Sequence, residues 1–243
     1  MYQQELIDYL LQYLNENRRQ LLFRDLDLRS NHLTLILEDF YHAHNISATM
    51  RTADCFGLKE LHIVENKIRY EYNPKINKGA DKWIHLNRYC EQEFNTPTCL
   101  NRLKAEGYRI VATSPHQGSY TIRELDLTRK TAIVMGSEGD GISEYVKEHA
   151  DAFLKIDMPG FTESLNVSVA AGIILETLTH RMRSEGHPWQ LDEEERHKLL
   201  IGNLAKMVPD CNLLEKRFME DRGIHEYEPL FKESALRRSS EIH

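Results

Sequence analysis

The chain has 243 residues, long enough for one α/β core with helical additions at its ends. With 41% hydrophobic and 28% charged residues it has an ordinary globular composition, and no apolar run approaches the roughly 20 residues that cross a bilayer, which argues against a membrane protein. The net charge of -7 argues against a uniformly basic RNA-binding surface. A local basic face is still compatible with this total, because basic residues gather near both ends, at Arg18, Arg19, Arg24, Arg29, Lys216, Arg217, Arg222, Lys232, Arg237 and Arg238.

The N-terminal residues and the cysteines of the chain indicate the cellular compartment. Glu5 and Asp8 interrupt the first apolar residues, and a basic start is missing, so the N-terminus does not read as a signal peptide and we expect a cytoplasmic protein. The cysteines show no Cys-x-x-Cys spacing, which predicts free thiols and neither a zinc site nor a disulfide framework; they are Cys55, Cys90, Cys99 and Cys211.

Hydrophobic periodicity in the first half predicts a helix and then a βαβ unit. Apolar residues at helical spacing indicate an amphipathic helix over residues 3–16. A strand over 33–37, a helix over 46–56 and a strand over 61–64 follow. The polar stretch from 65 to about 87 is too long for an ordinary connection, which suggests a functional loop; its basic residues are Lys67, Arg69, Lys75, Lys78 and Lys82.

The second half continues the alternation of helices and strands. We expect a helix over 98–106, strands over 108–112, 132–135 and 152–156, and a short helix that Ser143 caps and that ends at His149. A broadly apolar helix follows the loop 158–164 and must be buried, either in the core or between subunits. Beyond His187-Pro188 the sequence turns polar, with Glu193, Glu194 and Glu195 in a solvated helix, then a break at Pro209-Asp210 and one more helix. We therefore predict an N-terminal helical extension (1–29), a central domain (30–185), and a C-terminal helical extension and tail (186–243).

The segment IVMGSEGDGIS, residues 133–143, places a glycine-rich turn directly after an apolar strand. Glycines here allow a ligand to approach the backbone, but the spacing matches neither a Walker loop nor the Rossmann G-x-G-x-x-G. Glu138 and Asp140 would repel phosphates, so a phosphate-free adenosine ligand fits better than a nucleotide. The alternative is a tight β-to-α turn without a ligand.

The segment MPGFTESLNVSVAAGIIL, residues 158–175, joins a Pro-Gly turn to Ser164 and Asn166 at the start of the apolar helix. Either residue can be a simple N-cap. The density of polar residues beside an apolar helix argues for a ligand site instead.

The segment HNISATMRTADCFG, residues 44–57, places Asn45 and Arg51 on one helix. Their separation corresponds to about 600° of helical rotation, so a shared site needs Asn45 at the helix mouth and Arg51 reaching back. Arg51 taken alone is typical of a solvated surface charge. His42 and His44 have a metal-like spacing but no third ligand nearby, so no metal site is expected.

In this order the segments resemble the SPOUT superfamily of RNA methyltransferases, and its TrmH branch in particular, over about residues 30–185. Asn45 and Arg51 match the first motif, MGSEGDGIS with Glu138 the second, and PGFTESLNVSVAAGI with Ser164 and Asn166 the third.

The resemblance implies an α/β parallel sheet with a deep trefoil knot in its C-terminal part, an exception to unknotted topology. It further implies a homodimer whose active site draws on both subunits, and S-adenosylmethionine bound by the knot loops. The matching positions for the cofactor are Thr113, Gly136, Ile156 and Leu165.

The implied reaction is methyl transfer to a ribose 2'-hydroxyl, with a guanosine in the tRNA D-loop as the expected substrate and ribosomal RNA as the alternative. The resemblance implies that Arg51 removes the proton from the ribose hydroxyl. Because a guanidinium keeps its own proton to a pKa above about 12, we expect Arg51 at least to stabilise the developing alkoxide. Asn45, Glu138, Ser164 and Asn166 would shape the catalytic pocket. A knotted RNA-binding protein without catalysis stays open, and a Rossmann-like enzyme is disfavoured.

Overall fold

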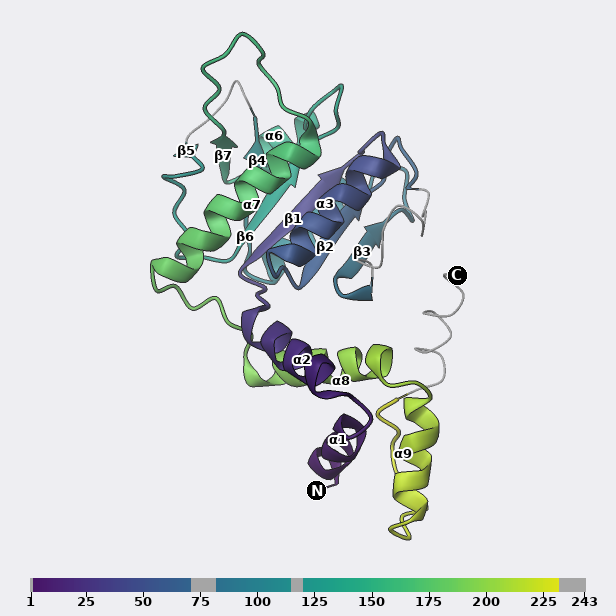
Figure 1. Ribbon diagram of the computed structural model, residues 1–243. Coiled ribbons are helices and arrows are strands. Elements are labelled where there is room, and N and C mark those ends of the chain that lie inside the picture. The colour runs from purple at the N-terminus through teal and green to yellow at the C-terminus, as the bar shows by residue number, and fades with distance from the viewer. Residues whose placement is uncertain (1, 71–81, 115–119, 232–243) are drawn as a thin grey trace. The chain divides into compact units, whose positions relative to one another are not determined.

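The computed structural model describes residues 2–70, 82–114 and 120–231. The chain divides into two compact units. One unit, here called the central unit, is Ser30–Gln190, and the other, the terminal unit, combines Met1–Arg29 with Leu191–His243 (Figure 1).

The described part of the central unit is built on one parallel sheet with the strand order β3-β2-β1-β6-β4-β7-β5. Its strands are β1 (Leu33–Glu38), β2 (Glu60–Val64), β3 (His85–Tyr89), β4 (Arg109–Thr113), β5 (Tyr120–Thr121), β6 (Thr131–Met135) and β7 (Ala152–Lys155). Every residue of β1 and β6 is buried, in register with Leu35 opposite Ile133. Such continuous apolar runs are typical of central parallel strands covered on both faces.

Helices cover both faces of this sheet. The helices α3 (Ala43–Cys55) and α7 (Val167–Ser184) pack against each other and against Leu35 and Leu37 of β1 (Figure 1). The helices α5 (Thr96–Ala105) and α6 (Glu144–His149) belong to a second core that contains Ile36, whose side chain points to the opposite face. The alternation along β1 therefore separates two hydrophobic cores.

The terminal unit joins both ends of the chain around a third core. Its helices are α1 (Gln3–Leu11), α2 (Glu16–Leu28), α8 (Glu193–Met207) and α9 (Cys211–Glu220). Leu6, Leu22, Leu204 and Phe218 are buried together in it. The N-terminal and C-terminal segments thus share one core. Among the described residues, no helix has the length and apolar character needed to cross a membrane.

Several element boundaries differ from those predicted. The first helix ends at Leu11 rather than near residue 16, and the unpredicted α2 begins after Asn15, whose side chain accepts a hydrogen bond from the Arg18 N–H. The loop predicted to reach residue 87 ends earlier, because β3 begins at His85; Lys75 and Lys78 lie outside the described residues. The short strand β5 was not predicted either. Helix α3 begins at Ala43, so Asn45 lies in its first turn.

Candidate functional site

The carboxyl ends of β1, β6, β4 and β7 meet at one edge of the sheet, the edge at which open parallel sheets bind their ligands. The loops that leave these strands enclose a cavity of about 730 Å³, here called the main cavity. Its walls come from the glycine loop (residues 136–142), the segment after β7, and the first turns of α3 and α7. All three sequence segments singled out above contribute to it.

The glycine loop is closed by its own backbone. Ser137 and Gly141 exchange two backbone hydrogen bonds, with N···O distances of 3.0 and 3.1 Å. The loop returns so close to Gly136 that a Cβ added there would lie 2.1 Å from the carbonyl carbon of Gly141. Gly141 itself has a φ of 70°, in the left-handed region that favours glycine. The backbone therefore requires glycine at position 136, which is among the residues that line the main cavity.

Side chains from the three segments form one hydrogen-bonded chain. The Asn166 amide donates to Oδ1 of Asn45 at 3.3 Å, and Nδ2 of Asn45 donates to Oε1 of Glu138 at 2.6 Å. The other Glu138 oxygen accepts the backbone N–H of Tyr41 at 2.9 Å. Partial desolvation raises the pKa of Glu138, but the bonds from Asn45 and Tyr41 outweigh it and hold this pKa below its ordinary value. Glu138 is thus an ionised acceptor at neutral pH.

Asn166 is also the N-cap of α7, because its Oδ1 accepts the backbone N–H of Ser168 at 2.9 Å. The same oxygen accepts the Ser168 hydroxyl at 2.7 Å. One asparagine therefore starts the apolar helix and joins it to the hydrogen-bonded chain.

A buried carboxylate anchors the other end of the glycine loop. Glu38, the last residue of β1, is 2% exposed and accepts hydrogen bonds from the N–H and the hydroxyl of Ser143 at 2.9 and 2.8 Å. Its Oε1 also accepts the Thr96 hydroxyl at 2.6 Å. Ser143 caps α6 by accepting the Val146 N–H, as predicted. Glu38 therefore ties the exit of the glycine loop to the sheet and to α5.

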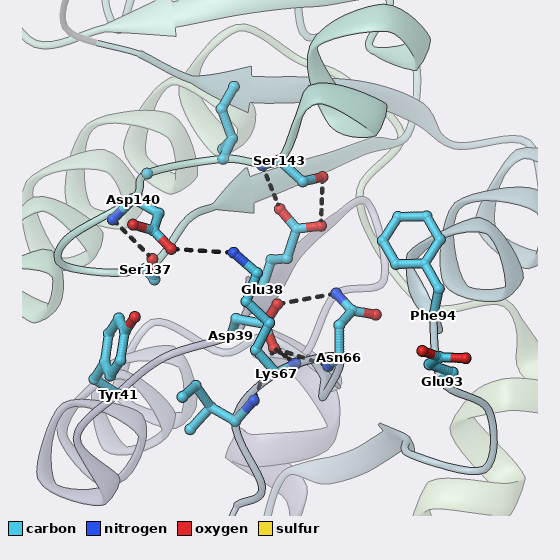
Figure 2. A pocket seen from close by; sticks show the side chains of 13 residues that line it. Glu38, Asp39, Tyr41, Asn66, Lys67, Glu93, Phe94, Ser137, Asp140 and Ser143 are labelled. Atoms are coloured by element: carbon cyan, nitrogen blue, oxygen red, sulfur yellow. Dashed lines mark hydrogen bonds and ion pairs between the residues drawn. The ribbon is translucent and has the colours of Figure 1, made fainter.

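A second, smaller pocket shares part of the glycine loop with the main cavity, and Figure 2 shows the side chains that line it. It has a volume of about 390 Å³ and is here called the side pocket. Asp39, at a φ of 52°, lines it and accepts the backbone N–H groups of Asn66, Lys67 and Ile68. Lys67 forms an ion pair with Asp140 at 3.2 Å, which links the segment after β2 to the glycine loop.

The structure brings together most of the residues proposed from the sequence. Thr113, Gly136, Ile156 and Leu165, the positions matched to the cofactor, all line the main cavity. Asn45, Glu138, Ser164 and Asn166 line it as well. Arg51 does not: it is exposed on α3 and is not among the lining residues. The described residues contain no group of three or more His, Cys, Asp or Glu side chains placed to hold a metal ion.

Glu38, Asp39 and Thr96 were missed by the sequence interpretation. Glu38 and Asp39 carried a signal, because two acidic residues end the apolar run Leu33–Leu37 at the carboxyl end of a buried strand. Such a position faces the ligand edge of a parallel sheet. Thr96 gave no comparable signal, since it stands at the start of an ordinary helix.

Residues 32–176 match the model of the SpoU rRNA Methylase family. The chain belongs to this family. The resemblance drawn from the three segments is therefore confirmed, and so is the α/β fold with a parallel sheet.

Family relatives cover most of the chain. A tRNA (guanosine(18)-2'-O)-methyltransferase of Borreliella burgdorferi is 35% identical over 86% of this chain and 94% of its own length. The Escherichia coli protein of the same name is 31% identical over 77% of this chain and 82% of its own length. A 23S rRNA (guanosine-2'-O-)-methyltransferase of Vibrio vulnificus is 34% identical over 69% of this chain and 68% of its own length.

Solved structures support the same fold. The TrmH/SpoU tRNA modifying enzyme of A. aeolicus is 33% identical, has a TM-score of 0.68, and is matched over 79% of this chain and 96% of its own. An AdoMet-bound rRNA methyltransferase from Sinorhizobium meliloti, at 24% identity and a TM-score of 0.54 over 65% and 60% of the two chains, shares the fold.

Proposed function

We propose that this SpoU family member transfers the methyl group of S-adenosylmethionine to the ribose 2'-hydroxyl of a guanosine in tRNA. The observation that carries the proposal is the hydrogen-bonded chain of Asn166, Asn45 and Glu138 at the wall of a cavity that opens over Gly136. The choice of substrate is supported by the relatives named as tRNA (guanosine(18)-2'-O)-methyltransferases. Guanosine 18, in the D-loop, is accordingly the proposed target.

The main cavity suits this cofactor in size and polarity. Its volume of about 730 Å³ falls within the range of roughly 300–1,000 Å³ that is typical of small-molecule sites. Glycine at position 136 lets the loop return close to its own backbone, and acidic Glu138 and Glu163 stand in the lining of the main cavity together with Lys147 and Lys155. A ligand with a sulfonium, an ammonium and a carboxylate finds both signs of charge there. Thr113, Gly136, Ile156 and Leu165 are the residues proposed to hold it.

When bound, the cofactor supplies an electrophilic methyl group, so the protein needs only to align the ribose and to manage the hydroxyl proton. Ionised Glu138 fixes the Asn45 amide, and Asn45 fixes the Asn166 amide, so these polar groups are oriented before the substrate arrives. Ser164 is exposed and lines the main cavity, so its hydroxyl is available to contact the ribose. The proposed role of Arg51 is to stabilise the developing alkoxide.

We further propose a homodimer, because the position of Arg51 is hard to reconcile with a site made by one chain. Arg51 is exposed and lies outside the lining of its own main cavity. Leu165, which lines the main cavity just before α7, and Val169, in the first turn of α7, are 39% and 50% exposed. A partner subunit seated on this end of α7 would bury these side chains and could supply its Arg51 to the cavity. The trefoil knot is proposed on the family resemblance.

The reaction is proposed to take place in the cytoplasm. The terminal unit is proposed to contact the RNA. Arg18 and Arg24 on α2 and Lys216 and Arg217 on α9 are exposed. Exposed cations of this kind provide the phosphate contacts that a net acidic protein needs locally.

Ribosomal RNA is the second candidate substrate, favoured by the similarity to the Vibrio vulnificus 23S rRNA enzyme. The two are separated by methyl transfer from labelled S-adenosylmethionine to unmodified tRNA and, in parallel, to ribosomal RNA, followed by mapping of the methylated ribose. Transfer to guanosine 18 of tRNA alone is the expected result. Transfer to ribosomal RNA alone would identify ribosomal RNA as the substrate in place of tRNA. Cofactor binding without any transfer would support a non-catalytic RNA-binding protein.

A further inference from the structure

The side pocket shares a wall with the main cavity. Ser137, Asp140, Gly141 and Ile142 line both, so the closed glycine loop is the partition between them. A nucleotide whose ribose reaches into the main cavity therefore has a second recess within reach for its base. The side pocket, at about 390 Å³, is large enough for a small molecule.

The charged groups of the side pocket are mostly acidic. Glu38, Asp39, Glu93 and Asp140 stand in its lining with Lys67 as the one basic residue among the lining residues described. This balance disfavours a phosphate and favours a neutral ligand that brings N–H donors. Charge alone, however, does not say which carboxylate is available.

Most of these carboxylates are already engaged. Glu38 accepts hydrogen bonds from Ser143 and Thr96, and Asp39 accepts backbone N–H groups. Asp140 is paired with Lys67. Glu93 differs: it is exposed, and no residue in the described ranges donates to its carboxylate. The acceptor left for a ligand is therefore Glu93.

Aromatic side chains complete the lining. Tyr41 and Phe94 are 47% and 42% exposed and stand at opposite sides of the side pocket, with Glu93 next to Phe94 (Figure 2). Phe94 is held by an edge-on contact with Tyr145, at 5.6 Å between ring centroids. Exposed rings at a cavity wall are the surfaces on which nucleobases stack.

We infer that the side pocket receives the guanine base of the target nucleotide, with Glu93 accepting its N1–H and N2–H groups and Phe94 stacking on its ring. Guanine fits because its Watson–Crick edge presents two adjacent N–H donors, which a carboxylate accepts as a pair. The base lies on one side of the glycine loop and the ribose on the other. This inference rests on the proposed function and adds the residue that selects the base.

The test replaces guanosine at the mapped position by inosine, which keeps N1–H but lacks the 2-amino group. Wild-type protein is expected to methylate the guanosine tRNA with a kcat/KM at least about tenfold above that of the inosine tRNA, because a site built to accept a hydrogen bond rejects the analogue without its donor. A glutamine at position 93 has one neutral acceptor oxygen instead of a carboxylate, so it cannot accept both N–H groups of guanine. In Glu93→Gln the ratio of kcat/KM for the guanosine tRNA to that for the inosine tRNA should therefore fall to about threefold or less. The matched control is Glu91→Gln, an exposed neighbour outside the side pocket, which should keep the wild-type ratio.

Binding of S-adenosylhomocysteine, measured by calorimetry, should be the same in wild type and Glu93→Gln. An unchanged guanosine-to-inosine ratio in Glu93→Gln, or equal rates on both RNAs in the wild type, would overturn the inference. Loss of cofactor binding in Glu93→Gln would also overturn it, since Glu93 would then act on the main cavity. Failure of the proposed function is distinct, because wild-type protein would then methylate no guanosine at all.

Discussion

Gly136→Ala tests whether the closed glycine loop makes the cofactor site. The new Cβ would stand 2.1 Å from the carbonyl carbon of Gly141 and 2.2 Å from the Ile142 nitrogen, and both are backbone atoms that no rotamer change can move away. Relief requires the returning limb of the loop to retreat by about 1 Å. Both hydrogen bonds between Ser137 and Gly141 would then break.

The size of the effect follows from these bonds. At about 0.5–1.5 kcal/mol each, their loss disfavours the closed loop by roughly 1–3 kcal/mol. If only the closed loop binds the cofactor, its affinity falls by up to the same free energy, or about fivefold to 150-fold. Calorimetric titration with S-adenosylhomocysteine measures this change directly, and circular dichroism establishes that the variant is folded.

Gly139→Ala is the matched control in the same loop. Its added Cβ would meet only Cε2 of Tyr41, at 3.8 Å, which is an ordinary contact. We expect its affinity to stay within about twofold of wild type. If Gly136→Ala binds S-adenosylhomocysteine as tightly as Gly139→Ala, the closed loop does not form the site and the reasoning fails.

Three further predictions concern other groups. Arg51→Lys should lower methyl transfer by at least about a hundredfold while S-adenosylhomocysteine binding is unchanged, and equal loss of both would contradict its role at the reacting hydroxyl. In Glu38→Gln the new amide NH₂ would face the N–H and hydroxyl donors of Ser143, so one hydrogen bond would be lost. The free energy of unfolding, measured by urea titration, should fall by about 1–3 kcal/mol, and an unchanged midpoint would refute this. Burial lowers the pKa of His62 to about 3, so its neutral form is kept in the fold while the unfolded chain takes up a proton near pH 6.5. Stability should therefore fall by about 1.4 kcal/mol per pH unit below 6.5, and His62→Gln should remove that part of the slope.

The elements that could be predicted from the sequence are those whose apolar period is unambiguous. Strands β1 and β6 are buried over their full length, and α7 carries a long apolar stripe, so each was placed within a few residues. Strand β3 was missed because it lies at the sheet edge, where His85 and Arg88 are exposed and the alternation is weak. Strand β5 has two residues, too few for any period to show.

Candidate residues could be named from the sequence, but their bonds could not. Asn45 and Glu138 are 93 residues apart, and Asn45 and Asn166 are 121 apart. No local sequence pattern predicts that such distant side chains meet. The parallel pairing of β1 with β6 brings the carboxyl ends of these two strands together. For Arg51 the helix geometry already separated it from Asn45, and in the structure it stays outside the main cavity.

From the sequence, capping and ligand-site organisation were competing explanations for Asn166. The structure shows both roles in one amide, because its oxygen caps α7 while its nitrogen donates to Asn45. Asn166→Asp separates them: aspartate is as good an N-cap, but it cannot donate, and its charge would repel the ionised Glu138 across Asn45. We expect unfolding stability within about 0.5 kcal/mol of wild type but a loss of methyl transfer of about tenfold or more. Asn166→Ala should lose about 1 kcal/mol of stability as well. If Asn166→Asp retains full activity, Asn166 serves the helix alone and the hydrogen-bonded chain does not contribute to catalysis.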